Sequence, residues 1–297
     1  MTPSENFAKT SPSFLVFLTF VCLFTGPALA QREQPDVSKI EVGVTDVGHH
    51  IYALSGYGGN VTVAVGTDGI IMVDAQYAPM HDKLKAKIAS LSPLPIKYLI
   101  NTHYHADHTG GNELFAKDGA IIVAYESVGK RMGKVPAAAL PVQTYAGMGT
   151  EVKIPGQTAE LVHQENAHTD GDTIVFWPSA NVISSGDIIV LDAYPNMSVA
   201  TGAGIDGMIA GANFIAAHAD AKTKIIPGHG PITDRKTVIA YGNMLKTARN
   251  RIAKAKIKGM SEDQVVKAHL LADLDKKWAA NDPQADRFPS VIYRSIK

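Results

Sequence analysis

Short apolar runs separated by glycine-rich turns fill the region from residue 50 to residue 125. Three of these runs have the length of strands, and the turns between them predict an antiparallel meander. They are residues 50–54, 60–66 and 69–74. Residues 80–90 then have helical composition, and further strands are expected at 96–100 and 120–124. This order of strands and helices predicts a mixed α/β arrangement with helices against the face of a sheet.

The second half of the chain repeats this alternation without repeating the sequence. Strands are expected at 150–154, 158–163, 173–176, 181–184 and 224–226. Residues 205–217 have the pattern of a helix, and apolar residues then recur every three or four positions from Val238 to Ile252. This stripe predicts a long amphipathic helix whose apolar face joins the core. A capping-box pattern at 261–264 starts a further helix, and Trp278 near the end of that helix is expected to fill a hydrophobic pocket.

The densest group of chemically active side chains follows the strand expected at 96–100. Four potential metal ligands lie within six residues, ahead of a glycine pair, so they are expected on a turn and not inside a regular element. They are His103, His105, Asp107 and His108. Side chains alternate in extended backbone, so His103 and His105 point to one side, while Asp107 and His108, past the bend, can face a second point nearby. One turn can therefore serve two neighbouring cations.

Three later segments each put a metal-capable side chain at the end of an expected strand. These side chains are His168 in segment 167–173, Asp187 in segment 185–188 and His229 in segment 227–231. A glycine beside each of them permits a sharp backbone turn. If all three converge on the first turn, they complete a shell of metal ligands.

Taken in order, these motifs resemble those of the metallo-β-lactamase superfamily. The motifs are His-x-His-x-Asp-His at 103–108, His-Thr-x-Gly-x-Thr at 168–173, Ser-Gly-Asp at 185–187 and Pro-Gly-His-Gly at 227–230. The resemblance runs from about Val44 to the helix after His229. It implies an αββα sandwich, in which two mixed β-sheets are flanked by helices. It also implies a site for one or two metal ions, usually zinc, at one edge of the sheets.

The resemblance assigns a role to each candidate ligand. The first metal would be bound by His103, His105 and His168, the second by Asp107, His108 and His229, with Asp187 as a bridge. Water bound at the open position has its pKa lowered from ~15.7 towards ~7, which makes hydroxide available at neutral pH. Asp107 would also orient this hydroxide and is the expected catalytic residue. The implied enzyme is a hydrolase with two zinc ions that opens a cyclic amide or ester, such as a β-lactam or lactone, by attack of metal-bound hydroxide.

The sequence departs from individual members of the superfamily in ways that leave the substrate open. Cysteine-containing β-lactamases have a thiolate where Asp187 stands and a lysine three residues later, where this chain has Val190. The all-histidine β-lactamase subclass shares the form of the 168–173 motif but lacks the bridging aspartate. Glyoxalase II-like thioesterases and acyl-homoserine lactonases share that aspartate. β-Lactam, lactone, ester and thioester cleavage are all candidates.

Two other classes of function remain open. Persulfide dioxygenases of the same fold use a single iron held by two histidines and the aspartate at position 187, so this ligand set also suits an iron-dependent oxidoreductase. A binding or relay protein that retains the metal with little turnover is the third alternative. No Ser-His-Asp or Cys-His constellation is found in the sequence, and a catalytic metal explains why none is needed.

The N-terminus has the pattern of a secretory signal. An uncharged apolar run at 14–24 follows Lys9, and small residues before position 31 suit cleavage after Ala30. Residues 1–30 are therefore expected to be a signal peptide, 31–297 the metallo-β-lactamase-fold domain, and the location periplasmic or secreted. A retained membrane anchor is the alternative, although a comfortable span needs ~20 apolar residues. Cys22 lies in the apolar run without the small neighbour that lipidation favours.

Composition narrows the chemistry and the partners further. Cys22 is the single cysteine of the chain, so a protein cleaved after Ala30 contains neither a disulfide nor a thiolate ligand. Lys and Arg total 28, as do Asp and Glu, so charge gives no reason to expect nucleic acid or an anionic membrane as a partner. The expected partner is a small-molecule substrate, without stable membrane association after signal cleavage.

A few polar residues outside the motifs are secondary candidates. Asp74 closes an apolar strand, and it is expected either to hold a ligand by hydrogen bonding or to be an ordinary turn aspartate. Tyr194, Asn196 and the turn at 54–59 are expected to face the substrate. Six further histidines lack a motif and are expected to have ordinary surface or core roles. They are His49, His50, His81, His163, His218 and His269.

Overall fold

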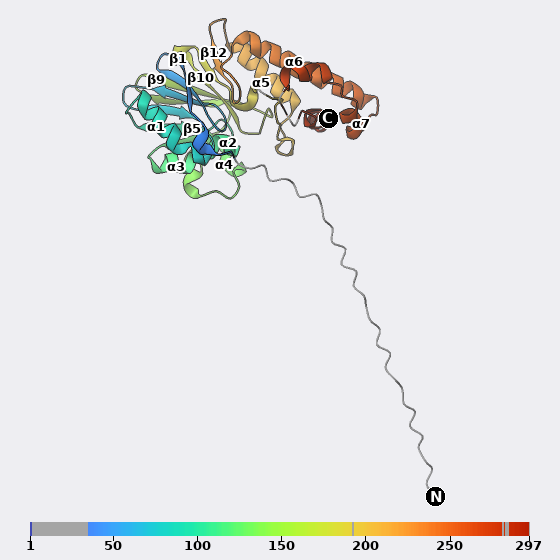
Figure 1. The fold of residues 1–297 in the computed structure, drawn as a ribbon, viewed down its shortest axis with the longest axis horizontal. Coiled ribbons are helices and arrows are strands. Elements are labelled where there is room, and N and C mark those ends of the chain that lie inside the picture. Colours follow the sequence, from blue (N-terminus) through green and yellow to red (C-terminus); the bar gives the residue numbers. More distant parts are fainter. Residues whose placement is uncertain (2–34, 192, 281, 283–284, 297) are drawn as a thin grey trace. The chain divides into compact units, whose positions relative to one another are not determined.

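Two mixed β-sheets form the centre of the computed structural model (Figure 1). The structure describes residues 1, 35–191, 193–280, 282 and 285–296. The first sheet has seven strands in chain order: β1 (Gly43–Gly48), β2 (Ile51–Ser55), β3 (Val61–Val65), β4 (Ile70–Val73), β5 (Ile96–Ile100), β6 (Ile121–Tyr125) and β7 (Gln143–Tyr145). Strands β1 to β4 are antiparallel, as the predicted meander requires, and β4 to β7 are parallel.

The second sheet is built from the second half of the chain. Its five strands lie in the order β12 (Lys224–Ile226), β11 (Val182–Ser184), β10 (Asp172–Trp177), β9 (Gln157–Gln164) and β8 (Gly149–Ile154). Strands β11 and β12 are parallel, and the other neighbours are antiparallel. Parallel pairs bring their carboxyl ends to the same edge of a sheet. In both sheets, therefore, the loops that follow parallel strands share an edge.

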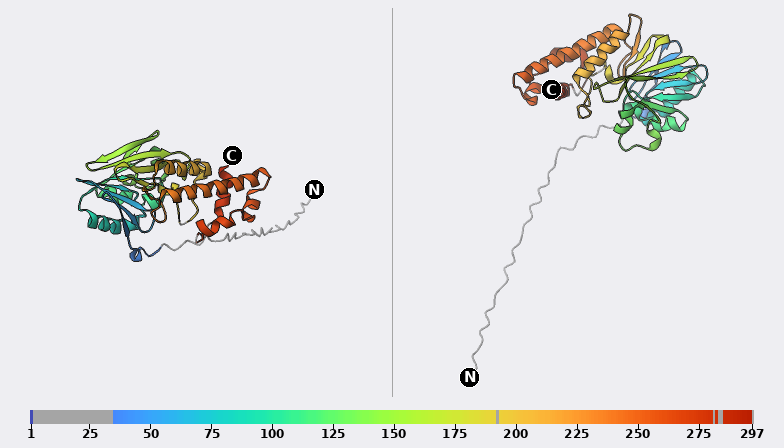
Figure 2. Two further views of the ribbon diagram at one scale, coloured as in Figure 1. Left: turned by 90° about the horizontal axis from the view of Figure 1, so that it is seen from above. Right: turned by 180° about the vertical axis from the view of Figure 1, so that it is seen from behind.

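Alternation along the strands explains the layers. In β4, Ile71 and Val73 pack between the two sheets, whereas Ile70 and Met72 pack on the outer face of the first sheet. All four residues are buried, because a strand that is covered on both faces has no exposed side. The outer face is covered by α1 (His81–Leu91) and α3 (Asn112–Lys117), which contribute Leu84 and Phe115. Helix, sheet and sheet are thus three consecutive layers (Figures 1 and 2).

Helices of the second half cover the outer face of the second sheet. The helices α5 (Ile205–His218) and α6 (Arg235–Ile257) pack together, and the predicted apolar stripe of α6 is buried against α5. Shorter helices follow: α7 (Glu262–Lys267), α8 (Ala272–Trp278) and α9 (Arg287–Ser295). Ser261 and Gln264 form the predicted capping box at the start of α7, and Trp278 is buried, as expected. This fourth layer confirms the αββα sandwich.

The structure corrects some of the local predictions. Residues expected on a turn after β5 include a short helix, α2 (Ala106–Thr109), because Thr109 and Gly110 return hydrogen bonds to His105 and Ala106. The strands β1 and β7 and the helices α3, α4 (Glu126–Arg131) and α9 were not expected. The helix expected to start at 261 ends at Lys267, and Trp278 lies in the separate helix α8. Four of the six residues of β1 are exposed, so its sequence lacks the apolar pattern from which strands are predicted.

The described elements all lie within one compact unit, Asp36–Lys297. The predicted signal peptide and its cleavage after Ala30 lie outside the described residues, so the boundary at residue 31 stays a prediction. Within the described part of the chain, no helix combines the length and the apolar character needed to cross a membrane.

Candidate metal centre

The loops at one edge of the two sheets bring seven of the predicted site residues together. From the first sheet come the segment after β5 and the helix α2, and from the second sheet come the β9–β10 turn and the segments after β11 and β12. The seven residues are His103, His105, Asp107, His108, His168, Asp187 and His229. Residues separated by more than 120 positions in the chain thus meet at one site.

The first group consists of three imidazoles and a carboxylate. His105 Nδ1 lies 3.1 Å from His103 Nε2 and 2.9 Å from His168 Nε2. Asp187 Oδ2 lies 3.3 Å from His168 Nε2 and 3.8 Å from His103 Nε2. His103 and His168 are buried, and His105 is half-buried. His103 and His105 lie in the same group, as predicted, although residues 102–104 bend instead of continuing the strand.

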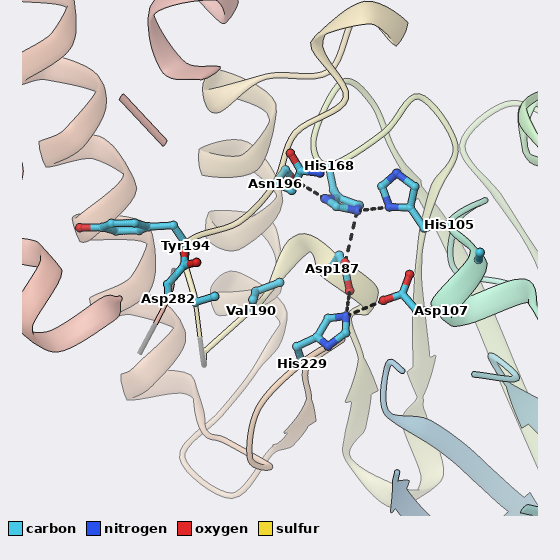
Figure 3. A pocket seen from close by; sticks show the side chains of 11 residues that line it. His105, Asp107, His168, Asp187, Val190, Tyr194, Asn196, His229 and Asp282 are labelled. Carbon is cyan, nitrogen blue, oxygen red and sulfur yellow. Dashed lines mark hydrogen bonds and ion pairs between the residues drawn. The ribbon is translucent and has the colours of Figure 1, made fainter. Parts of the chain in front are cut away.

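The second group adjoins the first through Asp187. Asp107 Oδ2 lies 3.1 Å from His229 Nε2 and 3.6 Å from His108 Nε2. Asp187 Oδ1 lies 3.2 Å from His108 Nε2 and 3.6 Å from His229 Nε2. The two oxygens of Asp187 therefore face different groups, which is the arrangement of a bridging carboxylate (Figure 3).

Hydrogen bonds on the far side of each ring fix where its proton lies. His168 Nδ1 is 2.5 Å from the carbonyl oxygen of Asn196, and a carbonyl only accepts, so Nδ1 carries the proton. His108 Nδ1 donates in the same way to Asp74 Oδ2 at 2.8 Å. The Thr102 hydroxyl donates to Asp74 Oδ2, which leaves its oxygen to accept from His103 Nδ1 at 3.0 Å. The Nε2 lone pairs of all three rings are thus directed into the two groups.

Converging lone pairs and carboxylates need a positive charge between them. His108 Nε2 and Asp187 Oδ1 are buried without a hydrogen-bond partner, and a buried polar atom without a partner is costly. In each group the candidate ligand atoms lie within 4.8 Å of one another, and all of them are nitrogen or oxygen. Divalent metal ions prefer such donors. The residues present therefore fit one metal ion in each group.

The pKa shifts reflect the same balance of charges. Burial and the neighbouring His168 lower the pKa of His105 to about 4. Burial would also lower the pKa of His108, but the carboxylates of Asp187 and Asp74 hold it well above its usual range. For Asp187, burial would raise the pKa, yet the surrounding imidazoles, His108 foremost, hold it well below its usual range. The negative charge that favours a proton on His108 equally favours a metal cation.

Several residues that support the ligands were not predicted as site residues. The carboxylate of Asp172 accepts hydrogen bonds from the backbone N–H groups of His168 at 2.7 Å and Thr169 at 2.8 Å, which fixes the β9–β10 turn. Asn60 Nδ2 donates to the carbonyl oxygens of Pro227 and Gly230, both at 2.9 Å, and so holds the loop of His229. In the sequence, the sign of this support was Asp172, an aspartate four residues after His168.

The structure distinguishes between the two expected roles of Asp74. Its side chain is buried and accepts hydrogen bonds from His108 Nδ1, from the Thr102 hydroxyl and from the Thr102 N–H. The predicted role in holding a ligand is therefore confirmed. Asp74 also has a positive φ of 62°, a conformation that aspartate tolerates better than most residues.

A cavity of about 610 Å³ opens beside the two groups. His105, Asp107, His168, Asp187 and His229 form its inner end. The rest of its wall is formed by Ala106, Val190, Ala193, Tyr194, Asn196 and Asp282. Tyr194 and Asn196 thus line the cavity as predicted, but the Tyr194 hydroxyl points away from the metal groups and towards the helices (Figure 3). Of the described residues in this wall, none is a lysine or an arginine.

The histidines without a motif lie outside both groups. His163 stacks on Tyr125 with ring centroids 3.6 Å apart, and its Nδ1 donates to the carbonyl oxygen of Asp172. His81 contacts Asp82 and Asp118 at the start of α1. The turn at 54–59 does not line the cavity, so the expectation that it faces the substrate is wrong. Instead it supports the site through Gly59, whose N–H donates to the carbonyl oxygen of Asp107.

Substitution of Gly228 by alanine is expected to disrupt the second group. A Cβ at this position would lie 2.0 Å from Asp187 Oδ1 and 2.7 Å from the backbone of Gly186. The bridging carboxylate or the His229 loop must then move, so we expect more than a tenfold loss of metal affinity. The matched control is Gly129→Ala in α4, where the nearest neighbour is an ordinary contact at 3.4 Å from Pro141. Equal zinc affinity in both variants, measured by competition with a chelator dye, would contradict this prediction.

Comparison with known proteins agrees with the geometry. A family model described as the metallo-beta-lactamase superfamily matches residues 54–229. Among characterised relatives, 2,4-dinitroanisole O-demethylase subunit alpha of Nocardioides sp. (strain JS1661) is 29% identical over 137 residues, which are 43% of this chain and 40% of that protein. The hydroxyacylglutathione hydrolase of Erythrobacter litoralis (strain HTCC2594) is 30% identical over 95 residues, 32% of this chain and 34% of that protein. The chain thus spans less than half the length of these two relatives.

Two further comparisons cover more of the fold. Metallo-beta-lactamase IND-1 of Chryseobacterium indologenes is 24% identical over 194 residues, 61% of this chain and 77% of that protein. The solved structure of a metallo-beta-lactamase from Pontibacter korlensis is similar with a TM-score of 0.60 and 18% identity, over 69% of this chain and 99% of that one. The family match spans more than half of the chain and ends on His229, the last of the seven residues. The chain belongs to the metallo-beta-lactamase superfamily.

Proposed function

We propose that this protein is a dinuclear zinc hydrolase that opens a cyclic amide or ester. The observation that carries the proposal is the bridging position of Asp187 between two groups of ligands at the inner end of a cavity. His103, His105 and His168 would hold one zinc ion, and Asp107, His108 and His229 the other. When bound, zinc is a Lewis acid that polarises a carbonyl and lowers the pKa of water, so that hydroxide is available at neutral pH.

Residues of the chain supply the remaining parts of the reaction. The side chain of Asp107 is partly exposed to the cavity, and Oδ2 already lies against His229. Burial would raise its pKa, but the contact with His229 and the proximity of His108 lower it, so Asp107 is a carboxylate at neutral pH. Asp107 can therefore orient the attacking water and carry a proton from it to the leaving nitrogen or oxygen.

The cavity wall favours substrates that lack a carboxylate. A carboxylate-bearing substrate gains most when its pocket supplies a cationic partner. The described residues that line this cavity include no lysine or arginine, and Arg287 lines a separate cavity beside it. Neutral lactones and esters therefore fit this wall better than β-lactams with a free carboxylate do. We propose lactone or ester cleavage as the main activity.

Substitution of Val190 by lysine is expected to shift this preference. Val190 lines the cavity and pairs with the backbone of His229, so a lysine there would place an ammonium beside the second group. A charge-assisted hydrogen bond is worth about 1.5–3 kcal/mol, so the KM for benzylpenicillin should fall by about tenfold or more. The KM for its methyl ester should not fall. Val190→Met has similar length without the charge, and an equal fall in KM for this control would contradict the electrostatic explanation.

A thioesterase is the second candidate, since one relative is a hydroxyacylglutathione hydrolase. The deciding experiment is a screen of the zinc-loaded protein with paired substrates: nitrocefin and imipenem, neutral lactones, acyl-glutathione thioesters and 2,4-dinitroanisole. Metal analysis by mass spectrometry accompanies the screen. Lactone turnover with about two zinc ions per chain supports the proposal. One iron per chain with oxygen consumption on a persulfide would overturn it in favour of an oxidoreductase.

Export to the periplasm or the medium is part of the proposal. It is supported by the sequence pattern of residues 9–30. N-terminal sequencing of the protein recovered from the periplasmic fraction should give Gln31 as the first residue. Recovery of the uncleaved chain in the membrane fraction would instead support a retained anchor.

A further inference from the structure

One loop contacts both the cavity and the ligands of the first group. This loop, residues 193–198, is called the pocket loop, and its residues Ala193, Tyr194 and Asn196 line the cavity. The carbonyl oxygen of Asn196 accepts the proton of His168 Nδ1 at 2.5 Å. The N–H of Ser198 donates to the carbonyl oxygen of His168 at 2.9 Å. The ring and the backbone of His168 are therefore both held by the pocket loop.

The pocket loop also reaches the far side of His105. Because His105 Nδ1 faces the other ligands, its Nε2 must carry the proton of the neutral ring. Ser198 Oγ lies 3.5 Å from this Nε2, and the Tyr104 hydroxyl is 2.8 Å from the same oxygen. The ring of Tyr104 packs edge-on against His105 at 4.6 Å. Ser198 and Tyr104 therefore restrain the orientation of this imidazole.

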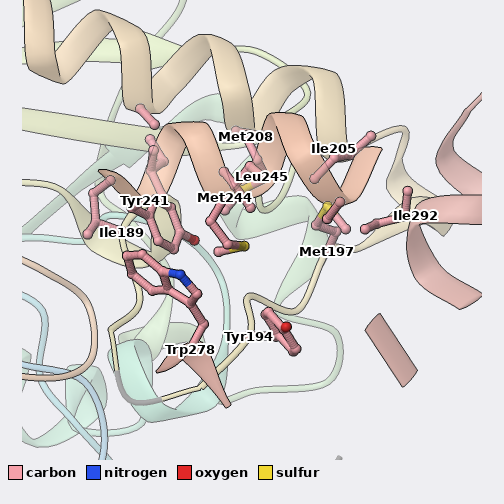
Figure 4. Close-up of a cluster of buried hydrophobic side chains, with 14 of the residues drawn as sticks. Ile189, Tyr194, Met197, Ile205, Met208, Tyr241, Met244, Leu245, Trp278 and Ile292 are labelled. Carbon is pink, nitrogen blue, oxygen red and sulfur yellow. The ribbon is translucent and has the colours of Figure 1, made fainter. Parts of the chain in front are cut away.

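The opposite side of the pocket loop is anchored to the C-terminal helices. The Tyr194 hydroxyl donates to Asp275 Oδ1 of α8 at 2.8 Å, and the Tyr194 ring stacks on Phe288 of α9 with centroids 4.3 Å apart. Tyr194 is only 6% exposed and belongs to the same apolar cluster as Trp278 and Ile292 (Figure 4). Burial and the Asp275 carboxylate raise the pKa of Tyr194 far above its usual value, so the hydroxyl keeps its proton.

We propose that Tyr194 is a positioning residue through which α8 and α9 set the metal affinity of the first group. The family match ends at His229, so both helices lie outside the region that is shared with the superfamily model. Residues that only orient metal ligands typically change metal affinity by about 10–100-fold. The inference rests on the metal-binding part of the proposed function and is independent of which bond the enzyme cleaves.

The test compares variants that remove side-chain contacts of the pocket loop. Tyr194→Phe removes the bond to Asp275 and keeps the stacked ring, and Asp275→Ala removes the same bond from α8. Ser198→Ala removes the contacts with His105 and Tyr104. Tyr293→Phe is the matched control, because its hydroxyl in α9 bonds to the carbonyl oxygen of Met260 and not to the loop. Zinc affinity is measured by competition with a chelator dye, and the ligand field by the visible spectrum of the Co²⁺-substituted protein.

The expected result is a loss of zinc affinity of about tenfold in Tyr194→Phe and Asp275→Ala, with an altered Co²⁺ spectrum. Ser198→Ala should change the spectrum in the same way, and Tyr293→Phe should leave both readouts unchanged. If Tyr194 merely stabilises the fold, its variant and the Tyr293 variant will lower the unfolding temperature without changing zinc affinity or the spectrum, which overturns the inference. Should Tyr194→Phe not fold, Asp275→Ala decides.

Failure of the inference can be told apart from failure of the proposed function. The hydrolase is refuted and the inference stands if the wild-type protein binds zinc but cleaves no substrate in the screen, while Tyr194→Phe lowers the zinc affinity. A wild-type protein that binds neither zinc nor Co²⁺ overturns both.

Discussion

Substitution of Asp187 by asparagine is expected to remove at least one of the two metal ions and nearly all turnover. Asparagine keeps the shape of the side chain and loses its charge, so no anion remains between the two groups. Its amide nitrogen would replace one of the carboxylate oxygens that face His168 and His108. The loss of zinc affinity should exceed the 10–100-fold range that is typical of residues that only support ligands. Metal content and zinc affinity, measured after dialysis, test this expectation.

A matched control separates the loss of the bridge from a general effect of charge. Asp206→Asn removes a carboxylate that is 65% exposed and pairs with Arg249 on the surface. Such exposed pairs contribute about 0–1 kcal/mol, so this variant should keep both metal ions. A folded Asp187→Asn protein with two zinc ions at wild-type affinity would show that Asp187 is not the bridge.

The ligands could be predicted because each lies at the end of a strand that is itself visible in the sequence. The strand β5 has the predicted bounds of 96–100, and β12 those of 224–226. The apolar runs fixed these strands, and the glycine turns that follow them carry His103 and His229. Parallel strands have their carboxyl ends at the same edge of a sheet, so residues that follow these ends can be predicted to lie close together from the strands alone.

The residues that hold the ligands could not be predicted in the same way. Asn60 contacts the carbonyl oxygen of Pro227, 167 positions away, and Tyr104 contacts Ser198, 94 positions away. Asn60 lies outside the motifs and Tyr104 occupies a variable position of the 103–108 motif, so neither role is visible in the sequence. Both roles depend on where the packed loops meet. The short strand β7 and the mostly exposed β1 escaped prediction for a related reason, since pairing with a neighbour and not an apolar pattern defines them.

The two sides of the cavity differ in how they are built. The inner end comes from loops within the region shared with the superfamily, residues 54–229, and the metal groups lie there. The outer wall includes Asp282, which follows α8. Asp282 also lines a second cavity of about 290 Å³, together with Arg287, Phe288 and Val291 of α9. Substrate selection is therefore expected to depend on the C-terminal helices, while the chemistry depends on the shared loops.

Substitution of Asp107 by asparagine is expected to lower turnover by about 10²–10⁴-fold even when zinc is supplied in excess. Proton transfer by a positioned carboxylate contributes an effect of this size, and asparagine cannot accept the proton. The side chain of Asp107 is 21% exposed, so unlike the buried Asp187 it can reach both water and substrate in the cavity. Part of the loss of turnover will come from weaker binding of zinc in the second group, where Asp107 Oδ2 faces His229. Rates measured across a zinc titration separate the two effects. A rate that recovers to the wild-type value at saturating zinc would make Asp107 only a ligand. A plateau at least 100-fold below the wild-type rate, in a protein with full metal content, identifies the role of Asp107 in moving the proton.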